Sequence, residues 1–278
     1  MAIANPAQAV ESSKLLFLDD LREHPLPPIE AQKTALDYHQ IRISVTGRLN
    51  KEPLVDVGEY GIASRSAYAR AHAPYYRSFE SSLGQVLVRE TVAGKLRRVN
   101  DLLRPYGAEV LTLDGFRPID LQHDLWNHFI EQGKTQLENP SEEELTRFAG
   151  QFCSDPRGFD KDDFRTWPVH NTGGAIDLTL RSVYDGHELF MGSIFDDADG
   201  VSSTRHFETA GLTSQSAIEA KRNRRLLFHA MTAVGFANYA HEWWHFDFGT
   251  QMWVMNGGHK CAARYGRTDL SNRGNCAC

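Results

Sequence analysis

The sequence has few cysteines and lacks long apolar runs. Three of the four cysteines, Cys261, Cys276 and Cys278, lie near the end of the chain without a C-x-x-C pair. This spacing excludes a disulfide framework and favours free thiols, including Cys153. No apolar run reaches membrane-spanning length, and residues 1–14 lack the regions of a signal peptide, so we expect a cytoplasmic protein with no membrane partner.

An excess of basic residues is also absent. The 30 Lys and Arg are scattered among 36 Asp and Glu, with a net charge of −6, so nucleic acid is excluded as a partner. The length of 278 residues and the 41% hydrophobic content suit one globular domain. We place this domain at residues 15–278, after a disordered start at 1–14 and with a C-terminal extension from about residue 250. The sequence leaves the oligomeric state open.

The periodicity of apolar residues predicts an α+β fold, with a small antiparallel sheet flanked by helices. Helices are expected at residues 91–104, 120–133, 141–152 and 214–234. A β-rich run at 109–113 predicts a strand that delivers Arg117 on a turn at its carboxyl end. Trp253 and Tyr265 indicate that part of the C-terminal extension packs on the domain.

The stretch His241-Glu242-Trp243-Trp244-His245 matches H-E-x-x-H, a pattern that on a helix supplies two zinc ligands and a general base. However, Gly235 ends the preceding helix a few residues upstream, and the residues after His245 alternate like a strand. We therefore expect an extended or turning segment, with Glu242 as the base and His241 as a hydrogen-bonded core residue. A zincin-type endopeptidase that uses His241, Glu242 and His245 on a helix is the alternative.

A second group of polar residues surrounds a pair of glycines. Asp177 lies seven positions after His170, an odd number, so a straight strand would direct the two side chains to opposite faces. Gly173 and Gly174 can supply the turn or bulge that brings both to one point. Zinc hydrolases typically present three protein ligands and keep one position open. His170, Asp177 and His245 are therefore expected to bind one zinc ion at the centre of the sheet.

Four blocks of the sequence together resemble the D-Ala-D-Ala dipeptidases of the VanX type. In the order of that family they are Asp114-Gly115-Phe116-Arg117-Pro118, residues 170–180, residues 191–196 and Glu242-Trp243-Trp244-His245. The resemblance implies that His170, Asp177 and His245 bind zinc, and that Glu242 is the general base and later the acid. It also implies that Arg117 stabilises the tetrahedral oxyanion and that Asp196 pairs with the free ammonium group of a D,D-dipeptide such as D-Ala-D-Ala.

Two departures from the family pattern leave the exact dipeptide open. Pro168 stands where these enzymes usually have Ser, and residues 45–50 match their Asn-Phe-Thr-Gly-like motif only in part. One alternative function is a D,D- or L,D-carboxypeptidase acting on peptidoglycan peptides, which needs a pocket open at the amine end, so Asp196 discriminates. The other is a non-catalytic zinc-bearing module that binds peptidoglycan; Glu242 and Arg117 argue against it, because a structural zinc site needs neither.

Overall fold

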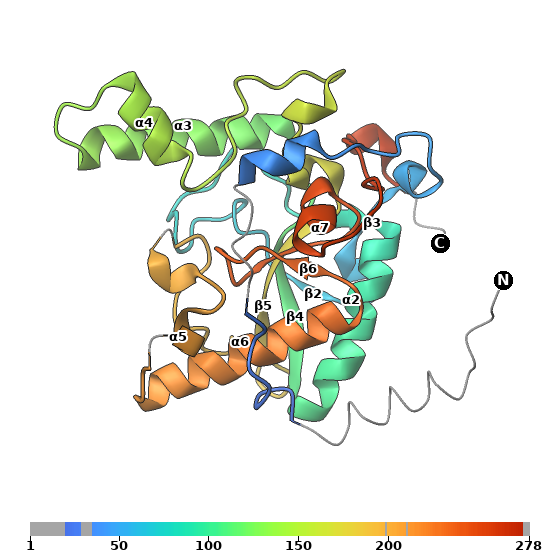
Figure 1. Ribbon diagram of the computed structural model, residues 1–278, viewed down its shortest axis with the longest axis vertical. Coiled ribbons are helices and arrows are strands. Elements are labelled where there is room, and N and C mark those ends of the chain that lie inside the picture. The colour runs from blue at the N-terminus through green and yellow to red at the C-terminus, as the bar shows by residue number, and fades with distance from the viewer. Residues whose placement is uncertain (1–19, 29–34, 198, 210, 275–278) are drawn as a thin grey trace.

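The computed structural model describes residues 20–28, 35–197, 199–209 and 211–274. The expectations for residues 1–14 and for Cys276 and Cys278 lie outside these ranges. A central sheet with helices around it forms the body of the protein, and α3 and α4 extend away from the sheet at one end (Figure 1). Within the described residues, no helix has both the length and the apolar character needed to cross a bilayer.

The central sheet has five strands in the order β2-β4-β5-β7-β6. Their bounds are β2 Ala63–Ser64, β4 Ala108–Asp114, β5 Ala175–Ser182, β6 Ala237–Asn238 and β7 His245–Asp247. Neighbouring strands run antiparallel, except that β2 pairs with β4 in parallel. A second, two-stranded sheet pairs β1 (Leu54–Asp56) with β3 (Leu87–Arg89). The predicted α+β fold with a small antiparallel sheet is therefore confirmed, with one parallel edge strand.

Six α-helices lie within the described residues. They are α2 Glu90–Leu103, α3 Ile119–Gln136, α4 Glu142–Ala149, α5 His206–Thr209, α6 Gln215–Ala233 and α7 Gln251–Asn256. The 3-10 helices are η1 Ala35–Gln40, η2 Leu49–Lys51, η3 Val57–Tyr60, η4 Arg104–Tyr106, η5 Phe164–Thr166, η6 Val169–Thr172, η7 Gly200–Ser202 and η8 Leu270–Asn272. The four predicted helices are confirmed as α2, α3, α4 and α6, although α4 ends three residues early, before Gly150.

Helices α2 and α6 cover one face of the central sheet. Helix α2 contacts β4, α6 contacts β5, and the two helices contact each other. Ile176 and Leu178 of β5 and Phe246 of β7 belong to the main hydrophobic core. Because side chains alternate along a strand, Asp177, His245 and Asp247 are directed to the opposite face. Trp253 and Tyr265 lie in the same main core, as the sequence predicts for the C-terminal extension.

Candidate active site

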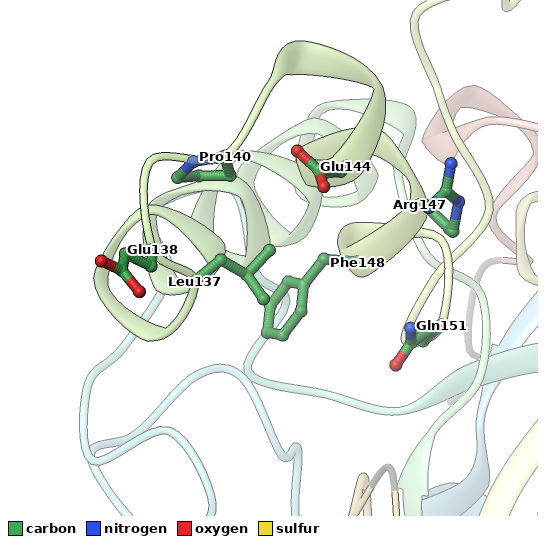
Figure 2. Close-up of a pocket in the computed structure, with 7 residues that line it drawn as sticks. All are labelled: Leu137, Glu138, Pro140, Glu144, Arg147, Phe148 and Gln151. Atoms are coloured by element: carbon green, nitrogen blue, oxygen red, sulfur yellow. The ribbon is translucent and has the colours of Figure 1, made fainter.

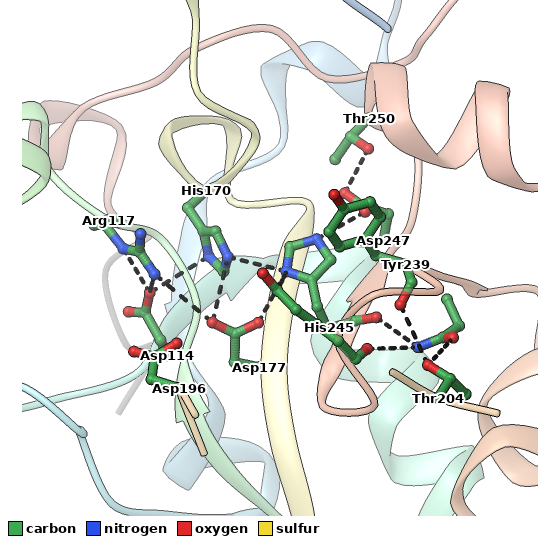
Figure 3. Close-up of polar contacts among 12 residues, drawn as sticks. Asp114, Arg117, His170, Asp177, Asp196, Thr204, Tyr239, His245, Asp247 and Thr250 are labelled. Atoms are coloured by element: carbon green, nitrogen blue, oxygen red, sulfur yellow. Dashed lines mark hydrogen bonds and ion pairs between the residues drawn. The ribbon is translucent and has the colours of Figure 1, made fainter. Parts of the chain in front are cut away.

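The loop that carries His170 is shaped by one glycine. Helix η6 ends at Gly173, which has a φ of 71° in the left-handed region that glycine occupies without a steric penalty. A Cβ at this position would lie 2.6 Å from Cδ2 of Leu54, so the loop also needs the space that glycine leaves. The turn brings His170 above Asp177 at the start of β5 and confirms the expectation for the glycine pair (Figure 3).

Three buried side chains from distant segments converge at the sheet. Nε2 of His170 lies 3.3 Å from Nδ1 of His245 and 3.4 Å from Oδ2 of Asp177. Nδ1 of His245 lies 2.9 Å from Oδ1 of Asp177 (Figure 3). Ligand atoms that each lie ~2.0–2.1 Å from a tetrahedral zinc ion are about 3.3 Å apart, so this donor set has the spacing and the chemistry for such an ion.

Both imidazoles are oriented by partners on their other ring nitrogen. Nδ1 of His170 lies 2.8 Å from the Gly115 carbonyl oxygen, and Nε2 of His245 lies 2.9 Å from Oδ2 of Asp247. Thr250 in turn donates a hydrogen bond of 2.6 Å to Oδ1 of Asp247. These contacts direct Nε2 of His170 and Nδ1 of His245 toward Asp177, in the way that ligating histidines are held in metal sites.

The charge states of the two histidines also suit a cation. Burial lowers the pKa of His170 to about 3, so its ring is neutral and its Nε2 lone pair is available. Burial likewise lowers the pKa of His245, but Asp247 and Asp177 outweigh it and hold this pKa well above the usual value. His245 therefore carries a proton between two carboxylates, and a metal ion bound at Nδ1 would replace that proton.

Arg117 lies directly beside the ligand cluster. Its Nη2 is 3.7 Å from Oδ2 of Asp177 and 2.8 Å from Oδ2 of Asp114. The same guanidinium donates from Nε to Asp114, from Nη1 to Gln122 and from Nη2 to the hydroxyl of Tyr68. Burial raises the pKa of Asp114 to about 7, although Arg117 lowers it. These contacts hold Arg117 rigidly. The second N–H of Nη1 donates no hydrogen bond to any described residue.

Asp196 lies next to this arginine network. Its Oδ2 accepts hydrogen bonds from Tyr68, at 3.0 Å, and from Tyr75, at 2.6 Å. Asp196 has a φ of 57°, a left-handed conformation that Asp adopts more readily than most residues and that is enriched at functional sites. In residues 45–50, Asn50 hydrogen-bonds to Val45 and Gly266. The contacts of Asp196 with the early part of the chain come from Tyr68 and Tyr75.

The stretch from His241 to His245 is not a helix. Residues 241–244 form a turn between β6 and β7, and His245 begins β7. Oε2 of Glu242 lies 3.9 Å from Nδ1 of His245, whereas His241 is outside the group of potential ligands. His241 is also exposed, so the expectation of a core histidine is wrong: the turn directs its side chain outward. Trp243 and Trp244 are buried and pack in the core.

The carboxyl group of Glu242 is partly exposed and has a strongly raised pKa. The side chain keeps 28% of its surface exposed. Desolvation nevertheless raises the pKa of Glu242 to about 8, with Asp177 and Asp196 adding to the effect and His245 opposing it. A carboxyl group that titrates near neutral pH is suited to both accepting and returning a proton.

The comparison with protein families covers all of these residues. A family model described as "D-ala-D-ala dipeptidase" matches residues 53–264, most of the chain. The chain belongs to this family. Its members are metallopeptidases. His170, Asp177 and His245 form a possible metal site, with ligand atoms within 4.8 Å of one another.

Individual relatives share parts of the sequence. A D-alanyl-D-alanine dipeptidase of Synechocystis sp. is 29% identical over 178 residues, which cover 58% of this chain and 70% of the relative. One of Escherichia coli is 31% identical over 141 residues, which cover 51% of this chain and 55% of the relative. The chain thus spans about half the length of the second relative.

Solved structures with a partly similar fold include two forms of a D,D-peptidase. The D,D-pentapeptidase VanY in complex with Zn(II) is 13% identical, with a TM-score of 0.37 over 68% of this chain and 89% of that chain. VanYB in complex with D-alanine-D-alanine is also 13% identical, with a TM-score of 0.39 over 68% and 88% of the two chains.

A surface cavity of about 360 Å³ lies elsewhere in the protein, between the loop that follows α3 and helix α4 (Figure 2). It is lined by Leu137, Glu138, Pro140, Glu144, Arg147, Phe148 and Gln151. None of His170, Asp177, His245, Glu242 and Arg117 contributes to it. The cavity is therefore separate from the candidate active site.

Four residues that contact the site are not assigned to it by the sequence analysis. Tyr68 and Tyr75 come from an irregular segment that has no periodicity. Asp247 carried a usable signal, because a residue two positions after His245 on a strand lies on the same face. Asp114 was part of the resemblance, but only its contact with Arg117 reveals its place in the site.

Proposed function

We propose that this chain is a zinc-dependent dipeptidase that hydrolyses a D,D-dipeptide such as D-Ala-D-Ala. The observation that carries the proposal is the spacing of the donor atoms of His170, Asp177 and His245, with the carboxyl group of Glu242 beside them. These three residues would hold one zinc ion per chain, within a single domain over residues 15–278. When bound, zinc supplies Lewis acidity at the scissile carbonyl and lowers the pKa of water.

Glu242 is the proposed general base. One of its carboxylate oxygens accepts the proton of the attacking water, and the resulting carboxylic acid returns the proton to the leaving amine. Its position supports this role, because Oε2 lies close to His245 without being bound by any hydrogen bond in the described structure. Proton transfer of this kind contributes ~10²- to 10⁴-fold to the rate.

Arg117 is the proposed stabiliser of the oxyanion. Its contacts with Asp114, Gln122 and Tyr68 hold the guanidinium in place before substrate binds, so little reorganisation is needed when negative charge develops. The N–H of Nη1 that keeps no described partner can serve this purpose. Removing one well-placed donor of this type costs about 10²- to 10³-fold in kcat.

Asp196 is the proposed counter-ion of the substrate's amino terminus. A carboxylate at this end of the site favours a substrate whose ammonium group lies one residue from the scissile bond. This limit distinguishes a dipeptidase from a D,D- or L,D-carboxypeptidase, which must accept a longer chain there. Glu242 and Arg117 beside the potential ligands argue against a non-catalytic peptidoglycan-binding module, because a structural zinc site needs neither residue.

The test compares the wild type with Glu242→Gln after loading with zinc. We expect both proteins to hold one zinc ion, measured by elemental analysis, and the variant to lose ~10²- to 10⁴-fold in release of D-alanine from D-Ala-D-Ala. N-acetyl-D-Ala-D-Ala and an L,D-peptide serve as competing substrates. Faster cleavage of either than of the free dipeptide would establish the carboxypeptidase alternative, and zinc binding without any turnover would establish the binding module.

A further inference from the structure

Two tyrosine hydroxyls meet on one oxygen of Asp196. Tyr68 and Tyr75 both lie within hydrogen-bond distance of Oδ2, and Tyr68 also accepts a hydrogen bond of 3.0 Å from Nη2 of Arg117. A phenol has a single hydrogen to donate. Because the guanidinium of Arg117 can only donate, the hydrogen of Tyr68 must point to Asp196.

This pattern favours the ionised carboxylate. Oδ2 of Asp196 receives two donated hydrogens, which stabilise the negative charge on that oxygen. Burial and Asp177 raise the pKa of Asp196 to about 6, whereas the hydrogen bonds from Tyr75 and Tyr68 and the charge of Arg117 lower it, so the group is ionised at neutral pH. Among the described residues Asp196 forms no ion pair, and Arg117 reaches it only through Tyr68. A partly buried anion without a direct cationic partner is costly, and a primary ammonium group of a ligand would remove that cost.

The tyrosines are held in place independently of the metal ligands. The backbone after β2 continues to pair with β4, through Arg65 N–H to the Thr112 carbonyl and Ala67 N–H to the Leu113 carbonyl. The rings of Tyr68 and Tyr75 pack at 5.4 Å from each other, and Phe79 packs edge-on against both. This aromatic cluster presents both hydroxyls to Asp196 before any substrate arrives.

We propose that Tyr68 and Tyr75 are specificity-determining residues: they hold Asp196 as an anionic anchor for a primary ammonium group, and Tyr68 joins this anchor to Arg117. The proposal deepens the proposed function and rests on it for the identity of the substrate. Both tyrosines are positioning residues, since they act through Asp196 and Arg117. The proposal assigns them different effects, because the hydroxyl of Tyr75 hydrogen-bonds only to Asp196, whereas that of Tyr68 also hydrogen-bonds to Arg117.

The kinetic test uses Tyr75→Phe and Tyr68→Phe, which remove only the hydroxyls. We expect Tyr75→Phe to raise KM for D-Ala-D-Ala about 10- to 100-fold with little change in kcat, since a hydrogen bond to a charged group is lost. Tyr68→Phe should raise KM and also lower kcat. For N-acetyl-D-Ala-D-Ala, which has no ammonium group, Tyr75→Phe should leave kcat/KM unchanged, so the preference for the free amine falls.

A matched control removes a hydroxyl outside the site. Tyr106 accepts a hydrogen bond from the backbone N–H of Leu21, so Tyr106→Phe should leave KM, kcat and the amine preference as in the wild type. An unchanged KM for the free dipeptide in Tyr75→Phe with full zinc content would overturn the proposal. Equal losses with the free and acetylated substrates would overturn it as well, because they would indicate only a structural role.

A binding measurement separates this proposal from the proposed function. Calorimetry with D-alanine and N-acetyl-D-alanine on the zinc-loaded protein reports recognition of the ammonium group without any hydrolysis. If the wild type prefers D-alanine, and Tyr75→Phe loses the preference, the anchor stands even if no dipeptide is cleaved. If the wild type binds the two ligands equally or binds neither, the proposal fails, whatever the dipeptidase assay shows.

Discussion

His245 and Asp247 lie on the same side of β7, and Nε2 of His245 is 2.9 Å from Oδ2 of Asp247. The carboxylate of Asp247 is fully buried, and its other oxygen accepts a hydrogen bond from Thr250 at the start of α7. Thr250, the N-cap residue of α7, thus supports the orientation of His245 on the sheet. The start of the C-terminal extension is therefore connected to His245 through a chain of two hydrogen bonds.

Replacing Asp247 is expected to weaken metal binding without removing a ligand. Asp247→Ala deprives His245 of the acceptor that orients its ring, a change that typically costs ~10- to 100-fold in metal affinity. Asp247→Asn keeps an oxygen acceptor but not the charge, so its loss should be smaller. Competition with a chelating zinc indicator measures both variants. Wild-type affinity in Asp247→Ala would show that His245 does not need this partner.

Parts of the group of potential metal ligands can be predicted from the sequence because their signals are local. The glycine pair between His170 and Asp177 predicts a turn, and Gly173 adopts the left-handed conformation that such a turn requires. Asp177 lies in the β-rich run that follows these glycines, and this run forms β5 in the structure. Strand periodicity likewise excludes a helix at His245. Each of these inferences needs only a few neighbouring residues, so it survives without knowledge of the tertiary structure.

The arrangement around Asp196 could not be predicted in this way. Tyr75 and Tyr68 are 121 and 128 residues away from Asp196 along the chain. They lie in a segment without helix or strand periodicity, whose path is set by pairing of the backbone with β4. The same limit explains the error at His241, since the direction of a side chain in a turn depends on the turn's geometry.

The two histidines of the H-E-x-x-H pattern should respond differently to substitution. His245→Ala removes a donor atom of the cluster, and we expect it to abolish stoichiometric zinc binding and turnover. His241→Ala changes an exposed side chain outside the potential ligand group, so zinc content and kcat/KM should stay within about twofold of the wild type. Elemental analysis and dipeptide hydrolysis report both. Loss of zinc in His241→Ala would restore the zincin-type alternative.

Gly173 should be much less tolerant of alanine than another glycine with the same backbone conformation. Gly173 and Gly61 have φ values of 71° and 70°, but an added Cβ meets Leu54 at Gly173 and nothing within 4 Å at Gly61. Gly61→Ala therefore isolates the backbone penalty, ~1–2 kcal/mol. Gly173→Ala adds a steric clash worth about 1–3 kcal/mol.

Denaturant unfolding of the metal-free proteins measures this difference. Gly173→Ala should also lower zinc affinity, because the clash displaces the turn that carries His170, whereas Gly61→Ala should not. Equal destabilisation by the two substitutions would mean that the space around Gly173 adjusts freely. In that case the glycine would be needed only for its backbone conformation.

Glu242 should make the metal-free protein less stable as the pH rises. Burial raises the pKa of Glu242 from 4.5 to about 8, so across this interval the unfolded chain has released the proton while the folded protein retains it. The folded state therefore loses stability from pH 4.5 up to about pH 8, relative to a variant that cannot ionise. The full shift corresponds to ~4–5 kcal/mol, and partial exposure of the side chain reduces this to about 2–3 kcal/mol.

Urea unfolding of metal-free wild type and Glu242→Gln at pH 4.5 and pH 8 tests this expectation. Near pH 4.5 the two proteins should be close in stability, and at pH 8 Glu242→Gln should be the more stable by about 2–3 kcal/mol. Zinc reverses the electrostatic argument, because a divalent cation beside Glu242 favours the carboxylate. The advantage of Glu242→Gln should therefore shrink in the zinc-loaded proteins. A difference between the two proteins that is independent of both pH and zinc would mean that Glu242 ionises freely in solvent, too far from the cluster to serve as its base.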